Sequence, residues 1–76
     1  MNAKRRKSLS KLADKIEELK AELSLLIEEE QEYFDNMPES FQVAEKGENT
    51  ESVIETLTSA FTNLEEAYDS IIESTE

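Results

Sequence analysis

The sequence contains no cysteine, histidine or tryptophan, and only one glycine and one proline in 76 residues. Without cysteine it forms neither a disulfide nor a thiolate metal site, and without histidine a zinc site would need carboxylates alone, which is unusual. The longest apolar run covers residues 25–27, too short to cross a bilayer, and no apolar segment follows the basic start as in a signal peptide. We therefore expect a soluble cytoplasmic protein without a metal or other cofactor.

Catalytic motifs are missing as well. The chain has no histidine or cysteine for nucleophilic chemistry, no glycine-rich phosphate loop and no Glu-x-x-His pair of the kind that holds two irons in a helical bundle. Asp35-Asn36 is too short for a calcium-binding loop. The sequence therefore favours a protein that binds or assembles, and we do not expect an enzyme.

Charge is the first strong feature that the sequence does have. Residues 1–20 hold seven of the eight basic residues and three acids, whereas residues 21–76 hold one base and sixteen acids. The net charge of −11 thus divides into a basic start of +4 and an acidic body of −15. Two interpretations follow: the acid keeps a small protein soluble, or it occupies a basic surface on a partner.

Residues 1–7 are predicted to form a basic tip ahead of the first helix. The consecutive cations are Lys4, Arg5, Arg6 and Lys7. Cations oppose the helix dipole at an N-terminus, so we expect a frayed start with Ser8 as the N-cap. Four charges without interleaved aromatic residues are a weak nucleic-acid signal, and the acidic body would repel a duplex. Direct binding of nucleic acid is therefore not expected.

Residues 8–35 are predicted to form one long helix, because their apolar residues are spaced by three and four in a heptad pattern. The resulting seam consists of Leu9, Leu12, Ile16, Leu19, Leu23 and Leu26, and continues through Glu30, Tyr33 and Met37. Glu30 is the charged residue of this seam. Either it lies at a solvated end of a bundle, or it is a buried polar group that sets the register or pairs with a cation, such as Lys46 or a basic residue of another subunit.

Residues 36–49 are predicted to connect two helices. The residue before Pro38 avoids the helical conformation, and Pro38 is suited to the first position of a short helical turn. This turn would carry Phe41 and either Val43 or Ala44 inward, and Gly47 would supply a positive φ before the next helix. The connection is longer than an antiparallel helix pair needs, so it is either a packed cap or a binding loop.

Residues 50–74 are predicted to form the second helix, with Asn49 or Thr50 as its N-cap. Two overlapping apolar seams run along it. One consists of Val53, Leu57, Ala60, Leu64, Ala67 and Ile71, and the other of Ile54, Leu57, Phe61, Leu64, Tyr68 and Ile71. A face this wide indicates more than one neighbouring helix.

Together these elements predict a single all-α domain, residues 1–76, in which an antiparallel helical hairpin self-associates into a four-helix bundle. A small chain has little core of its own, and two helices leave one side of each seam open, so a homodimer or a higher multiple is expected. The predicted oligomer core consists of Leu12, Ile16, Leu19, Leu23, Leu26, Leu57, Phe61, Leu64, Tyr68 and Ile71.

The connection resembles that of a group of small uncharacterised proteins found in phage and prophage genomes. The matching segments are YFDNMPE at residues 33–39 and EKGE at residues 45–48. The resemblance also covers the basic start, the Leu/Glu-rich helix and the acidic second helix, and it implies a viral accessory protein in the cytoplasm of a bacterial host. By architecture alone the chain is similar to plasmid copy-number RNA-binding hairpin dimers. Its helices lack the exposed basic and aromatic face of those proteins, so RNA binding is not carried over.

Three functions remain open. The first is inhibition of a host defence factor by occupying a basic surface, for which Glu65, Glu66 and Asp69 form a possible acidic face. The second is an oligomeric sponge that holds a small anionic or nucleotide signal between subunits. The third is a structural or scaffolding oligomer. The residues considered for ligand or partner binding are Lys4, Arg5, Arg6, Lys7, Tyr33, Phe34, Asn36, Phe41 and Lys46.

Overall fold

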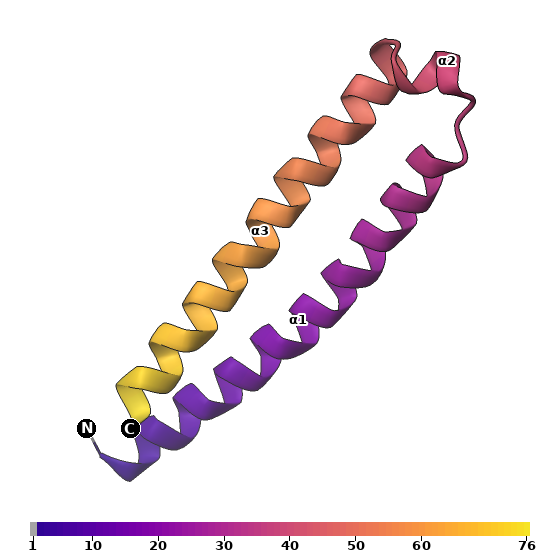
Figure 1. Cartoon of the computed structure of the whole chain (residues 1–76). Helices are drawn as coiled ribbons and strands as arrows, with labels where there is room; N and C mark the ends of the chain where they lie inside the picture. Colours follow the sequence, from indigo (N-terminus) through magenta and orange to yellow (C-terminus); the bar gives the residue numbers. More distant parts are fainter. Residues whose placement is uncertain (1) are drawn as a thin grey trace.

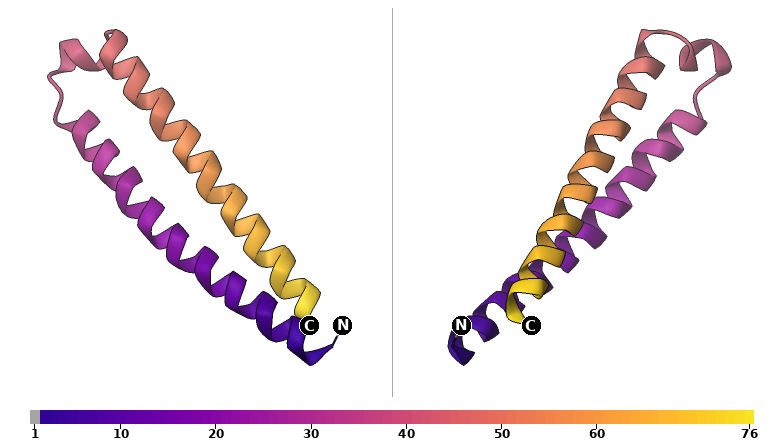
Figure 2. Two further views of the ribbon diagram at one scale, coloured as in Figure 1. Left: turned by 180° about the vertical axis from the view of Figure 1, so that it is seen from behind. Right: turned by 60° about the vertical axis from the view of Figure 1, so that its left-hand side comes forward.

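The computed structural model describes residues 2–76. Within them the chain forms three helices, α1 (Ala3–Asp35), α2 (Glu39–Gln42) and α3 (Glu45–Thr75). The two long helices run antiparallel and side by side, α2 lies in the turn that joins them, and the start of α1 lies beside the end of α3 (Figures 1 and 2). The result is a rod of 58 × 15 × 12 Å. The predicted all-α helical hairpin is confirmed.

The first helix begins earlier than predicted, at Ala3, and runs through the basic residues 4–7. Its N-cap is Asn2, whose Oδ1 accepts a hydrogen bond from the backbone N–H of Arg5 at 2.8 Å. The prediction of a frayed tip capped at Ser8 was therefore wrong. Asparagine is among the best N-caps, and lysine, arginine and alanine are strong helix formers. Together these effects outweigh the few tenths of a kcal/mol by which cations oppose the dipole.

The last helix also begins earlier than predicted, at Glu45 instead of residue 50, with Ala44 as its N-cap. Glu45 and Glu48 lie in its first turn, where carboxylates suit the positive end of the helix dipole. Thr50 is not a cap: it lies one turn inside the helix, and its Oγ1 donates a hydrogen bond to the carbonyl of Lys46 at 3.0 Å. The acidic first turn replaces a side-chain cap.

Gly47 serves a different purpose from the one predicted. No residue among 2–76 has a positive φ, so Gly47 does not make a left-handed turn. It is buried where α2 packs onto α3, and a Cβ at this position would overlap the backbone carbonyl of Gln42 and lie 2.6 Å from its Cα. Glycine is therefore needed for close approach of two backbones.

The connection between the long helices covers residues 36–44. Pro38 is the N-cap of α2 and not its first residue. Gln42 ties the turn back to α1, because its Nε2 donates a hydrogen bond to the carbonyl of Phe34 at 3.0 Å. Phe41 and Val43 remain 52% and 74% exposed, so the prediction that they point inward was wrong.

The hairpin has almost no fully buried core. In the described part of the chain, the residues classed as buried are Ala13, Gly47 and Thr50. All the other residues between the long helices are half-buried at most. A single layer of contacts between two rods cannot exclude water from both of its edges, so the interface between α1 and α3 stays partly open along its length.

Candidate partner-binding surfaces

The face of α1 that packs on α3 is not the one predicted. Leu9, Ile16 and Leu23 do lie between the helices, but the positions that alternate with them are displaced by one residue from the predicted seam. The residues that are buried or half-buried along this face are Leu9, Ala13, Ile16, Lys20, Leu23, Ile27, Glu30 and Phe34. Their spacing is again four and three, so both seams were present in the sequence.

The other half of the predicted α1 seam remains in solvent. Leu12, Leu19, Leu26 and Tyr33 are 48%, 51%, 54% and 47% exposed. These residues are seven apart, so they follow one line along the helix. Within one hairpin, Leu12, Leu19 and Leu26 stay outside the contact with α3, whereas Ile16 and Leu23 lie in it. That all five belong to an oligomer core stays a prediction.

On α3, one of the two predicted seams faces α1. Its members are half-buried, and they are Ile54, Leu57, Phe61, Leu64, Tyr68 and Ile71. The residues that belong only to the other seam are Val53, Ala60 and Ala67. Val53 is 45% exposed, Ala67 is exposed and Ala60 is half-buried. The wide apolar face of α3 thus extends beyond the contact with α1.

The apolar residues that do not belong to the contact between α1 and α3 lie on the same long side of the hairpin. Lys46 precedes Val53 by seven residues and therefore lies on the same line of α3. Its Nζ lies 5.6 Å from the centre of the Tyr33 ring, which ends the exposed line of α1. We name this side the apolar side, and it consists of Leu12, Leu19, Leu26, Tyr33, Val53, Ala60 and Ala67.

The opposite long side is polar. Two shallow grooves along it bring residues of both helices together. One is lined by Glu17, Lys20, Ala21, Ser24 and Phe61, and the other by Gln31, Phe34, Glu51, Ile54 and Glu55. We name this the polar side, and it consists of Glu17, Ser24, Gln31, Glu51, Thr58 and Glu65.

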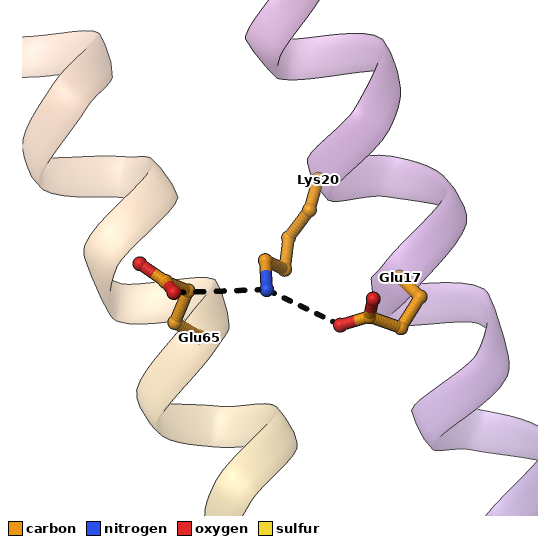
Figure 3. A network of polar contacts seen from close by, with 3 residues as sticks. All are labelled: Glu17, Lys20 and Glu65. Carbon is orange, nitrogen blue, oxygen red and sulfur yellow. Dashed lines mark hydrogen bonds and ion pairs between the residues drawn. The ribbon is translucent and has the colours of Figure 1, made fainter.

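Lys20 is the functional group that the sequence reasoning missed. Its side chain is 15% exposed and lies between the helices, with Nζ 5.3 Å from the centre of the Phe61 ring and 5.8 Å from that of Tyr68. The ammonium also contacts Glu17 at 3.2 Å and Glu65 at 3.9 Å (Figure 3). The signal was the alternative seam through Leu9, which passes through Lys20. This cation is held by its neighbours and is not free to bind a ligand.

The basic tip lies at the end of the rod where α1 begins and α3 ends (Figure 1). Lys4, Arg5, Arg6 and Lys7 are all exposed and helical. In the described part of the chain, ion pairs are formed only by Lys20, so these four cations have no carboxylate within 4.0 Å. Glu30 likewise forms no ion pair with Lys46, which lies over Tyr33 instead.

The predicted aromatic binding residues gather at the other end, around the turn. Phe34 is half-buried, Phe41 is exposed, and Asn36 caps the end of α1, where its backbone N–H donates a hydrogen bond to the carbonyl of Glu32 at 3.0 Å. Lys46 is the cation among them. The structure therefore groups Tyr33, Phe34, Asn36, Phe41 and Lys46, but the length of the rod separates them from the basic tip.

The predicted acidic face lies on the outer surface of α3. Glu65, Glu66 and Asp69 are exposed. Glu65 differs from the other two because its Oε2 lies 3.9 Å from the Nζ of Lys20. Glu66 and Asp69 have no cation within 4.0 Å in the described part of the chain, so they contribute their full charge to the surface.

Among residues 2–76, no group of three or more carboxylates is arranged to hold a metal ion. None of the described helices combines the length and the apolar character that crossing a bilayer would require. No family model, curated protein or solved structure matches the chain. The surfaces described above are thus the basis for a functional proposal.

Proposed function

We propose that the chain is a non-enzymatic accessory binding protein of a phage, and that two hairpins associate into a four-helix bundle. The acidic outer surface of this bundle would bind a basic surface of a host protein and thereby inhibit it. The observation that carries the proposal is the contrast between the two long sides of the hairpin. One side carries a line of apolar residues on each long helix, with Lys46 at its turn end, whereas the carboxylates lie outside these lines.

Self-association is supported by the apolar surface that the hairpin leaves exposed. Fully burying a leucine contributes roughly 1.5–3 kcal/mol. Leu12, Leu19 and Leu26 are each about half exposed, so burying the rest of each side chain would contribute about 1 kcal/mol. Two hairpins that cover each other would gain this six times. A closed pair with two-fold symmetry is the simplest assembly in which both copies bury the same side.

Binding to a basic partner is supported by the charge that remains outside. Every aspartate and glutamate of the chain is exposed except Glu30, which is half-buried. In the described part only Glu17 and Glu65 have a cation within 4.0 Å. A rigid rod with so many unpaired carboxylates attracts a positively charged protein over long range and speeds its encounter. The phage setting comes from the resemblance in the connection.

The sponge is less well supported than protein binding. It would combine the cations of residues 4–7 with the aromatic residues of the turn in one pocket. In the hairpin these groups lie at opposite ends of a molecule 58 Å long. The cation nearest the middle, Lys20, already has two carboxylates and two aromatic rings around it.

The proposal is tested by charge reversal on α3. The triple variant Glu66→Lys, Asp69→Lys and Glu73→Lys changes exposed acids and spares Glu65, whose reversal would also disturb Lys20. Tagged wild-type and variant proteins are used to capture proteins from a lysate of a bacterial host, and each captured protein is then purified and titrated against both. We expect a host protein whose affinity falls at least about tenfold in the variant and weakens with added salt.

The matched control reverses three exposed acids of α1, with Glu18→Lys, Glu28→Lys and Glu32→Lys. It changes the net charge by the same amount, so a purely nonspecific attraction would weaken equally in both variants. Unchanged affinity of the purified partner for the α3 variant would contradict the proposal.

A further inference from the structure

We infer that the apolar side binds a second copy of this chain with the two turns at the same end of the bundle, so that the leucine line of α1 packs on the alanine line of the partner's α3. This inference rests on the four-helix bundle of the proposed function and specifies its interface and orientation. A second copy is the occupant that the apolar side fits, for three reasons.

The first reason is that large and small side chains occur at matching levels of the rod. Tyr33 lies level with Lys46, as their contact of 5.6 Å requires. Because the helices are antiparallel, steps of seven residues in opposite directions give the other levels. They are Leu26 with Val53, Leu19 with Ala60, and Leu12 with Ala67. Each of these three levels thus offers one long side chain on α1 and a smaller one on α3.

A two-fold rotation about an axis parallel to the rod keeps these levels and exchanges the two helices. Each leucine of one copy then faces the smaller residue at the same level of the other copy. Alternation of large and small residues across facing positions fills a bundle evenly. Tyr33 would in the same way face Lys46 of the partner subunit.

The second reason is the absence of charge along the outer border of the alanine line. The α3 residues on this border are Asn49, Thr56, Asn63 and Ser70, and all are uncharged. The corresponding α1 residues are Ser8, Lys15, Glu22 and Glu29. When α1 packs on the partner's α3, charged residues meet neutral ones. In the alternative, head-to-tail arrangement, the two turns would lie at opposite ends of the bundle. The α1 helix of one copy would then pack on the α1 helix of the other, and the two Glu22 side chains would meet near the two-fold axis.

The third reason is the size of the apolar side. The long side of the hairpin on which these residues lie measures 58 by 15 Å, a projected area of roughly 870 Å² for each copy. Stable protein interfaces bury about 800 Å² on each partner. A second copy offers a side of the same dimensions, so two copies can cover each other from end to end.

Repulsion between the turn ends opposes this orientation. Residues 22–59 hold eleven acids and one base, so each copy brings a net charge of −10 to the shared end. The charges lie on outer surfaces, and screening reduces their interaction beyond about 8 Å at physiological ionic strength. The apolar contacts are not screened and thus determine the orientation. We expect the dimer to tighten as salt is raised.

The orientation is tested by measuring one distance across the dimer. The chain has no cysteine, so Ser40→Cys in α2 provides a single site for a nitroxide label, and Ser8→Cys provides another at the opposite end. Both serines are exposed and lie outside the apolar side. We expect double electron–electron resonance to give distances between the two copies below about 30 Å for both variants, given helix spacings of 8–10 Å.

Distances close to the 58 Å length of the molecule for both labels would overturn the inference in favour of the head-to-tail pair, while the four-helix bundle would stand. No dipolar coupling, together with a monomer mass in solution, would overturn both the inference and the bundle. The two failures are thus distinguishable.

The interface residues are tested in the same labelled proteins by a matched pair of substitutions. Leu26 and Leu25 are neighbours in α1 with similar exposure, 54% and 61%, but only Leu26 belongs to the apolar side. Leu26→Lys should raise the dissociation constant of the dimer at least about 100-fold and abolish the coupling, whereas Leu25→Lys should leave both within about threefold. Equal effects of the two substitutions would contradict the assignment.

Discussion

The two long sides of the hairpin differ in composition although both are built from the same pair of helices. On the apolar side, leucines of α1 lie beside Val53 and alanines of α3, and Lys46 is placed over Tyr33 at its end. On the polar side, Lys20 joins Glu17 to Glu65 across the helices. The polar side holds the ion pairs that Lys20 forms within one chain, whereas the apolar side leaves large side chains half exposed. The two sides therefore differ in how much apolar surface a further contact could still bury.

This contrast is most sharply tested by placing one charge at two alanines that are both exposed in the hairpin, Ala67 and Ala21. Ala67 belongs to the apolar side, whereas Ala21 borders a groove of the polar side. Ala67→Glu should cost several kcal/mol of dimer stability, because two carboxylates would enter the interface without partners. Ala21→Glu should change it by less than about 0.5 kcal/mol. Sedimentation equilibrium measures both, and similar values would mean that the two sides are equivalent.

The turn joins the two long helices, and within it the backbones of Gly47 and Gln42 approach each other closely. Gly47→Ala should lower the free energy of unfolding by about 1–3 kcal/mol, because the added methyl group overlaps the backbone of Gln42. Urea unfolding followed by circular dichroism, at fixed protein concentration, measures the change. Ser52→Ala is the control, since Ser52 is exposed within α3, and it should be neutral or slightly stabilising. A neutral Gly47→Ala would show that the turn can relax.

A smaller effect is expected at Lys20, on the polar side. Lys20→Met keeps an unbranched stem against Phe61 and Tyr68, and we expect the free energy of unfolding to change by less than about 1 kcal/mol. Lys20→Ala removes the stem and the contacts with both rings, and should cost about 1–2 kcal/mol. Thermal unfolding distinguishes the two. If Lys20→Met proved as destabilising as Lys20→Ala, the ion pairs would matter more than the packing.

The helical hairpin itself could be predicted from the sequence because heptad spacing, strong helix formers and one proline between two apolar stretches all indicate it. The choice of face on α1 could not. Starting from Leu9, steps of three and four residues lead through Leu12 or through Ala13, and hydropathy favours the leucine. The structure takes the route through Ala13 and Lys20, because the rings of Phe61 and Tyr68 accept an ammonium group between the helices. The choice between the two faces of α1 thus depends on side chains of α3, which the spacing within α1 does not reveal.

The ends of the helices were missed for local reasons. Asn2 is a strong N-cap, but four cations directly after it argued against a helix start. Gly47 was interpreted as a turn residue because glycine usually serves that purpose, whereas here it allows two backbones to touch. As for the candidate sites, the aromatic residues of the turn do lie together. Their separation from the basic tip follows from the length of the hairpin.

In solution, a second copy of the chain should cover the apolar side. Native mass spectrometry of the protein, purified gently from cells, measures whether it does. The prediction is a dimer at twice the polypeptide mass of 8.7 kDa, without an adduct. A helical monomer of 8.7 kDa at concentrations far above those in the cell would contradict it, and the apolar side would then be open for a different protein.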